Sequence, residues 1–150
     1  MSLDTNGIGE TMKKSVPWVG TSGVEFAEVS ADRVVATLPD APEVHNHVGG
    51  PHAAMMFGVG ETASGAIVVA AFGEHLGRAV PLVVRAEIAY RKVAHGPLRA
   101  EAVLGRPVSE VVAELDAGTR PEFPVRVTIS NAEGVTTGEM TVLWTLRPHR

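Results

Sequence analysis

The sequence predicts an α+β fold in which an antiparallel sheet of about six strands wraps around one long central helix. Three observations predict it: an almost continuous apolar stretch over residues 53–72, alternating hydrophobicity before that stretch, and the same alternation after it. A helix that is apolar all round needs burial on every side, and each alternating strand has one apolar face to offer. We expect residues 1–150 to form a single domain, with a flexible N-terminus over about residues 1–9.

Two strands are expected before the long helix, because hydrophobicity alternates from Val24 onward and again over residues 33–38. Residues 30–32 supply the turn between them, which makes the pair a hairpin. The hairpin ends at the Pro-Asp-Ala-Pro run of residues 39–42, since proline does not continue a central strand. A short helix over residues 10–16 is expected to precede the hairpin and to stop before a proline.

The long helix is predicted to start at Pro51, with Gly50 as its cap, and to end at Gly73 or Gly77. Its length would suffice to cross a bilayer. Glu61, however, lies near its centre, where a charge costs roughly 3 kcal/mol in a membrane. We therefore expect the core helix of a soluble protein and no membrane partner.

Four strands are expected after the helix. In the first, Leu82, Val84, Ala86, Ile88 and Tyr90 share one face, as in a half-buried antiparallel strand. The others are expected over residues 98–104, 125–129 and 140–146, with a short helix over 109–117 capped by Ser109. Two strands, one buried helix and four strands make up the hotdog architecture.

Composition excludes some classes of function. The chain has no cysteine, so disulfides and thiol catalysis are excluded, and a cytoplasmic location fits. Its formal net charge of −4 argues against a nucleic-acid partner. Two loop histidines, His45 and His47, could be imagined as metal ligands with Glu61, but they lack the spacing of a metal site, and we expect no metal.

The most informative stretch is the His-Asn-His-Val-Gly-Gly-Pro-His-Ala-Ala run of residues 45–54, which leads into the helix that carries Glu61. It resembles the hotdog thioesterases, in particular the PaaI-like group. Those proteins have a loop Asn or Gln, then Gly-x-x-His-Gly-Gly at the helix start, and an acidic residue nine positions after the histidine. Here Asn46 and His52 match, Ala53 and Ala54 replace the glycine pair, and Glu61 stands nine residues after His52.

The resemblance covers about residues 20–147. It implies an acyl-CoA thioesterase with no cofactor other than the coenzyme A of its substrate, working as a homodimer or a dimer of dimers; the thioester could also be carried by an acyl-carrier protein. It also implies that the backbone N–H of Ala53 binds the thioester carbonyl. Elementary chemistry agrees, because the first N–H groups of a helix, here those of His52, Ala53 and Ala54, have no partner within it and can stabilise an oxyanion.

Glu61 is the predicted general base or nucleophile, and Asn46 and His52 could orient the water or the carbonyl. Ala53 and Glu61 lie about 12 Å apart at ~1.5 Å rise per residue, so they cannot act on one carbonyl. If both are catalytic, each must serve a site that the other subunit completes, which requires a symmetric dimer.

Further residues are candidates for substrate binding because they border the loop, lie near Glu61 on the helix, or carry positive charge that could meet the phosphates of coenzyme A. They are His47, Gly50, Ala54, Met55, Gly58, Gly65, Arg85 and Arg91.

Three alternatives remain open at this point. Glu61 could be a structural carboxylate paired with a buried arginine or capped by backbone donors. His47 and Glu61, fourteen residues apart, have the spacing of the hotdog dehydratases, although Val48 and Gly49 replace the Phe-Pro that follows the histidine there. The protein could also bind an acyl group or coenzyme A without hydrolysing it.

Overall fold

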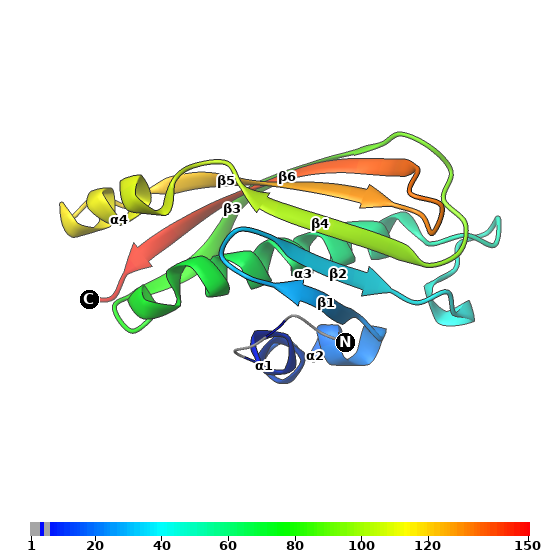
Figure 1. The fold of residues 1–150 in the computed structure, drawn as a ribbon, viewed down its shortest axis with the longest axis horizontal. Coiled ribbons are helices and arrows are strands. Elements are labelled where there is room, and N and C mark those ends of the chain that lie inside the picture. The colour runs from blue at the N-terminus through cyan, green and yellow to red at the C-terminus, as the bar shows by residue number, and fades with distance from the viewer. Residues whose placement is uncertain (1–3, 5–6) are drawn as a thin grey trace.

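The computed structural model describes residue 4 and residues 7–150, and in this part of the chain six antiparallel strands form one sheet over a long helix (Figure 1). The helices are α1 (Ile8–Ser15), α2 (Pro17–Ser22), α3 (Ala53–Phe72) and α4 (Val108–Asp116). The strands are β1 (Glu25–Val29), β2 (Val34–Leu38), β3 (Ala79–Tyr90), β4 (Leu98–Leu104), β5 (Glu122–Ser130) and β6 (Thr136–Pro148). The predicted α+β arrangement of six strands around one central helix is confirmed.

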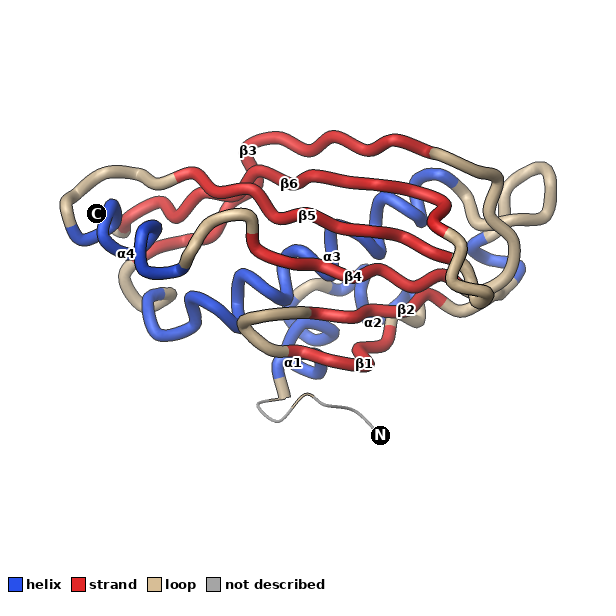
Figure 2. Tube along the Cα trace, turned by 45° about the horizontal axis from the view of Figure 1, so that its top comes forward, coloured by secondary structure: helices blue, strands red, loops and turns tan. Residues whose placement is uncertain are grey.

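The strands lie in the order β1-β2-β4-β5-β6-β3, and every neighbouring pair is antiparallel. The chain leaves β2, runs through α3 and returns as β3 at the opposite edge of the sheet. Figure 2 shows the sheet lying across α3, with α1 and α2 near its β1 edge. One edge of β3 pairs with β6, and its other edge has no partner strand among the described residues.

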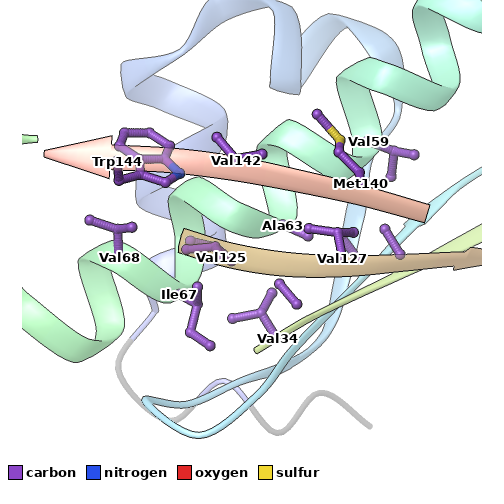
Figure 3. Close-up of a cluster of buried hydrophobic side chains, with 14 of the residues drawn as sticks. Val34, Val59, Ala63, Ile67, Val68, Val125, Val127, Met140, Val142 and Trp144 are labelled. Atoms are coloured by element: carbon purple, nitrogen blue, oxygen red, sulfur yellow. The ribbon is translucent and has the colours of Figure 1, made fainter. Parts of the chain in front are cut away.

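The core lies between α3 and the inner face of the sheet. Figure 3 shows side chains of α3 against side chains of the strands; those it labels are Val59, Ala63, Ile67 and Val68 on the helix and Val34, Val125, Val127, Met140, Val142 and Trp144 on the sheet. The indole N–H of Trp144 donates to the Ser64 hydroxyl at 3.1 Å, which satisfies the one polar group of that side chain. By length and composition the segment Ala53–His75 could cross a membrane, but most of it is buried within this fold.

The two N-terminal helices pack on α3. Asp4 accepts hydrogen bonds from the backbone N–H groups of Ile8 (3.1 Å) and Gly9 (2.7 Å), which caps the start of α1. Trp18 of α2 lies directly on Gly58, where a Cβ atom would collide with the indole ring. The flexible N-terminus predicted over residues 1–9 falls on residues 1–3 and 5–6 outside the described part, whereas Ile8 and Gly9 belong to α1.

The predicted start of the long helix is wrong by two residues. His52, in extended conformation, precedes the first helical residue, and its N–H donates to the Val44 carbonyl at 2.8 Å. Pro51 pairs with His45 in an isolated β-bridge, so the loop folds back on itself before the helix begins. The reason is tertiary: Gly50 lies so close to the Ala94 carbonyl that any Cβ atom would collide with it.

Two smaller predictions also need correction. Val84 does not share the inner face of β3, because the register with β6 shifts between Val83 and Arg85 and leaves Val83 and Val84 exposed. The helix α4 starts at Val108 after Pro107, and Ser109 lies inside its first turn without a capping hydrogen bond.

Close packing of α3 on the sheet gives a first prediction. A Cβ atom at Gly60 would lie 2.7 Å from the Met140 sulfur, inside the core. Gly60→Ala should therefore stabilise the helix by about 1 kcal/mol through its better propensity, but destabilise the core by about 1–3 kcal/mol through overpacking. We expect the free energy of unfolding in urea to fall by roughly 1 kcal/mol. Gly77→Ala is the matched control, since nothing lies within 4 Å of its Cβ position. Equal stability of the two variants would contradict the packing described here.

Candidate active site

Asn46 organises the loop that precedes α3. Its side-chain N–H donates to the Pro51 carbonyl at 3.2 Å, and its side-chain oxygen accepts from the N–H groups of Val48 (3.0 Å) and Gly50 (3.1 Å). Its backbone N–H donates to the Gly50 carbonyl at 2.7 Å. An amide that already makes three side-chain hydrogen bonds within the loop acts first as a positioning group for the helix start.

The start of α3 presents two free donors. The N–H groups of Ala53 and Ala54 have no acceptor among the described residues, and both residues are exposed. The N–H of His52, expected to be a third donor, is used by Val44. The Ala53 carbonyl, in contrast, has a partner. The Tyr90 hydroxyl donates to it at 3.0 Å and ties the helix start to the end of β3.

A cavity of about 500 Å³ lies at this helix start. It is lined by the loop, the first turn of α3 and the segment that follows β3: Asn46, His47, Val48, Pro51, Ala53, Met56 and residues 90–94. Of the predicted site residues, Asn46, His47, Ala53 and Arg91 therefore come together here. His52 caps the helix at its exposed end and does not line the cavity.

Glu61 lies in a different cavity, of about 270 Å³, on the side of α3 that faces the N-terminal helices. Its side chain is half-buried among mostly apolar neighbours, and this burial raises the pKa of its carboxyl. No described residue forms a hydrogen bond or ion pair with the carboxylate. A structural role for Glu61 would need a buried arginine or backbone donors at its carboxylate. Among the described residues there is no such partner.

Most of the other predicted binding residues lie elsewhere. Gly65 lines the Glu61 cavity, but Ala54 and Met55 do not, and Gly58 is covered by Trp18. Arg85 lies exposed on β3, and Arg91, which lines the helix-start cavity, also pairs with Glu139 at 3.1 Å. Within residues 4 and 7–150, no group of three or more His, Asp or Glu side chains could hold a metal, and His45 instead contacts Asp40 at 2.6 Å.

Sequence reasoning did not identify some residues of these two cavities. Tyr90, the only tyrosine of the chain, ends a strand, and that position is the one signal that could have marked it. Met12 of α1 and Val16, which lies between α1 and α2, line the Glu61 cavity from the N-terminal segment, which carries no motif. Trp144 belongs to the core, and its ring also lines this cavity.

Burial of Glu61 predicts a specific pH dependence. The folded state holds the proton of Glu61 more tightly than the unfolded chain does, so stability falls as the pH rises from the ordinary glutamate pKa through the raised value. Glu61→Gln removes this loss. We expect its melting temperature to exceed that of the wild type at pH 7.5, and the difference to shrink as the pH approaches 4. A variant less stable than wild type at pH 7.5 would indicate a partner for the carboxylate.

Solved structures match the whole fold. A Pseudomonas aeruginosa protein of unknown function, described as a "Probable Thioesterase", superimposes with a TM-score of 0.86 at 24% identity, covering 99% of both chains. A thioesterase family protein from Silicibacter pomeroyi gives 0.75 at 18% identity, covering 95% of this chain and 98% of its own. A protein of unknown function from Chlorobaculum tepidum gives 0.85 at 14% identity, covering 99% of both. These likenesses confirm the predicted hotdog fold.

No curated protein matches the chain. The profile of the domain of unknown function DUF4442, in contrast, matches residues 7–146, almost the entire chain. This match spans both cavities and every element from α1 to most of β6. The chain thus has the thioesterase-like hotdog fold of its structural neighbours and belongs to the DUF4442 family.

Proposed function

We propose that this protein is a thioester hydrolase that acts on acyl-CoA substrates as a homodimer. The observation that carries the proposal is Glu61, a half-buried carboxylate without a partner in the described chain, facing an apolar cavity. Retaining an ionisable group in such a place lowers stability, and catalytic carboxylates are a common reason to retain one. The thioesterase description of two structural neighbours supports the same class of reaction.

Two half-sites in each subunit support the dimer. The free donors of Ala53 and the carboxylate of Glu61 are eight residues apart on one helix, about 12 Å along its axis. They also line separate cavities. A two-fold axis that brings two α3 helices together in opposite directions would join each helix start to the partner's Glu61 and form two equivalent sites.

The free edge of β3 offers a way to build this dimer. Val83 and Val84 are exposed on this strand, at 42% and 45%, which is unusual for an isolated sheet edge. Tyr90, at one end of β3, holds Ala53, and Pro81, near the other end, lines the Glu61 cavity. Antiparallel pairing of two β3 strands about a two-fold axis near the middle of the strand brings the Pro81 end of each strand beside the Tyr90 end of its partner. Each Glu61 cavity then lies beside the partner's helix start.

In the proposed reaction the thioester carbonyl oxygen accepts a hydrogen bond from the Ala53 N–H of the partner subunit. Negative charge that develops on this oxygen is stabilised by the positive end of the helix. As a general base, Glu61 takes a proton from a water that attacks the carbonyl carbon and returns this proton to the departing thiolate of coenzyme A. As a nucleophile, Glu61 attacks the carbonyl carbon itself, the thiolate leaves, and water then hydrolyses the resulting anhydride to release the acid. A raised pKa makes the ionised Glu61 a stronger base than an exposed glutamate.

The alternatives make different demands. A dehydratase would require His47 and Glu61 to act on one 3-hydroxyacyl thioester. They line separate cavities within a subunit, so this reaction too would need the partner's Glu61. Loss of hydration activity in His47→Ala would support it. A binding protein without catalysis would retain affinity for an acyl-CoA in both wild type and Glu61→Gln, and neither would release free thiol.

Subunit complementation tests the proposal. Ala53→Pro removes only the N–H, because proline suits the first position of a helix and His52 already has the extended backbone that a following proline requires. Loss of one oxyanion donor should lower kcat about 10²–10³-fold, and Glu61→Gln should be inactive. Unfolding and refolding an equal mixture of the two variants should restore about a quarter of wild-type thiol release, since half of the dimers then hold one intact site.

Ala53→Gly is the matched control, because it retains the N–H and should remain active. Full activity of Ala53→Pro would exclude this donor. No recovery on mixing, with both single variants inactive and dimeric, would place the two groups in sites that the subunits do not share.

A further inference from the structure

The helix α3 contains three glycines. At two of them a neighbouring side chain leaves no room for a Cβ atom, and at the third there is room. A Cβ atom at Gly58 would collide with Trp18, and one at Gly60 would press on Met140. At Gly65 the nearest atoms would be the Met12 methyl at 3.4 Å and the Trp144 ring at 3.7 Å, ordinary contact distances. An alanine would fit there and would favour the helix. The space at Gly65 is therefore not required by the packing of the protein itself.

That space is part of the Glu61 cavity. Apolar side chains form most of its wall: Met12, Val16, Val19, Val68, Val69 and Trp144. Glu61 is the one charged residue of the lining. The other polar side chains are Thr62 and Ser15, whose hydroxyl donates to the Thr11 carbonyl at 2.9 Å. The hydrogen bond from Trp144 to Ser64 fixes the orientation of the indole, whose carbon edge faces Gly65.

We propose that this cavity binds the acyl group of the substrate, and that Gly65 and Met12 set its maximum size. The inference rests on the proposed function. A volume of about 270 Å³, at the ~30 Å³ that one water occupies in the liquid, holds about nine non-hydrogen atoms. The substrate class is then an apolar, compact acyl thioester, with a chain of about eight carbons or a single aromatic ring.

Hydrolysis of straight-chain acyl-CoAs from two to sixteen carbons tests the proposal. Wild type should reach its highest kcat/KM at or below about eight carbons. Gly65→Val should fill the cavity and move the optimum to shorter chains, with a loss of at least about tenfold at the wild-type optimum. Met12→Ala should move it to longer chains. Ala113→Val, on the exposed side of α4, is the control for a β-branched residue in a helix and should leave the profile unchanged.

Binding of S-alkyl-CoA thioethers, which cannot be hydrolysed, separates this proposal from the proposed function. Trp144 lies in the cavity wall, so its fluorescence should respond to the alkyl group. If no variant hydrolyses any thioester, but affinity depends on chain length and Gly65→Val and Met12→Ala move its optimum as expected, the acyl cavity is supported and the hydrolase activity is contradicted. If hydrolysis occurs but neither Gly65→Val nor Met12→Ala changes the length profile, the acyl cavity is wrong and the hydrolase stands. A wild-type profile that rises up to sixteen carbons would also overturn the size limit.

Discussion

The structure depends on burying a helix that is apolar on every side. The sheet covers one side of α3, and α1 and α2 contact it elsewhere, so that its middle turns are almost entirely inaccessible. Burial of this apolar surface, at about 25 cal/mol per Å², is the main favourable term for a domain of this size. It also creates the constraint on function, because any polar group on the helix must either find a partner or face a cavity. Ser64 finds Trp144, and Glu61 faces a cavity.

Glycines allow α3 and the loop before it to pack closely against their neighbours. The glycines at 58 and 60 let the helix approach Trp18 and Met140, and Gly50 lets the preceding loop lie against the Ala94 carbonyl. Asn46 then holds that loop with three side-chain hydrogen bonds, and Tyr90 fixes the first helical peptide. The helix start is therefore held rigidly although it is exposed, as a preorganised oxyanion donor needs to be.

The fold was predictable because its signals are local. Alternation with a period of two located the strands, and the run of apolar residues located α3. The same local reasoning misplaced the helix start, since it could not foresee that Gly50 and Pro51 belong to a folded-back loop that contacts Ala94. It also put Val84 on the inner face of β3, because a bulge shifts the phase of a strand without a mark in the sequence.

The candidate site was predictable only where a motif carried it. The spacing from Asn46 to Glu61 pointed to the loop, the helix start and the carboxylate. Nearness to Glu61 on the helix grouped Gly58 with Gly65, although Trp18 covers only Gly58. Met12 and Val16 reach the Glu61 cavity from the N-terminal segment and Trp144 reaches it from β6, far away in the chain, and such convergence depends on tertiary structure. The part of Arg85 and Arg91 in binding coenzyme A stays a prediction, since Arg85 is exposed and Arg91 pairs with Glu139 while it lines the helix-start cavity.

The central claim is that one site needs two subunits, and a crystal structure with a bound S-alkyl-CoA thioether tests it most directly. The account predicts a two-fold dimer paired through β3, with the thioether sulfur between Glu61 of one protomer and the partner subunit's Ala53, and the alkyl group beside Gly65. A thioether bound within a single subunit, or a dimer whose Glu61 cavities lie far from the partner's helix start, would contradict it.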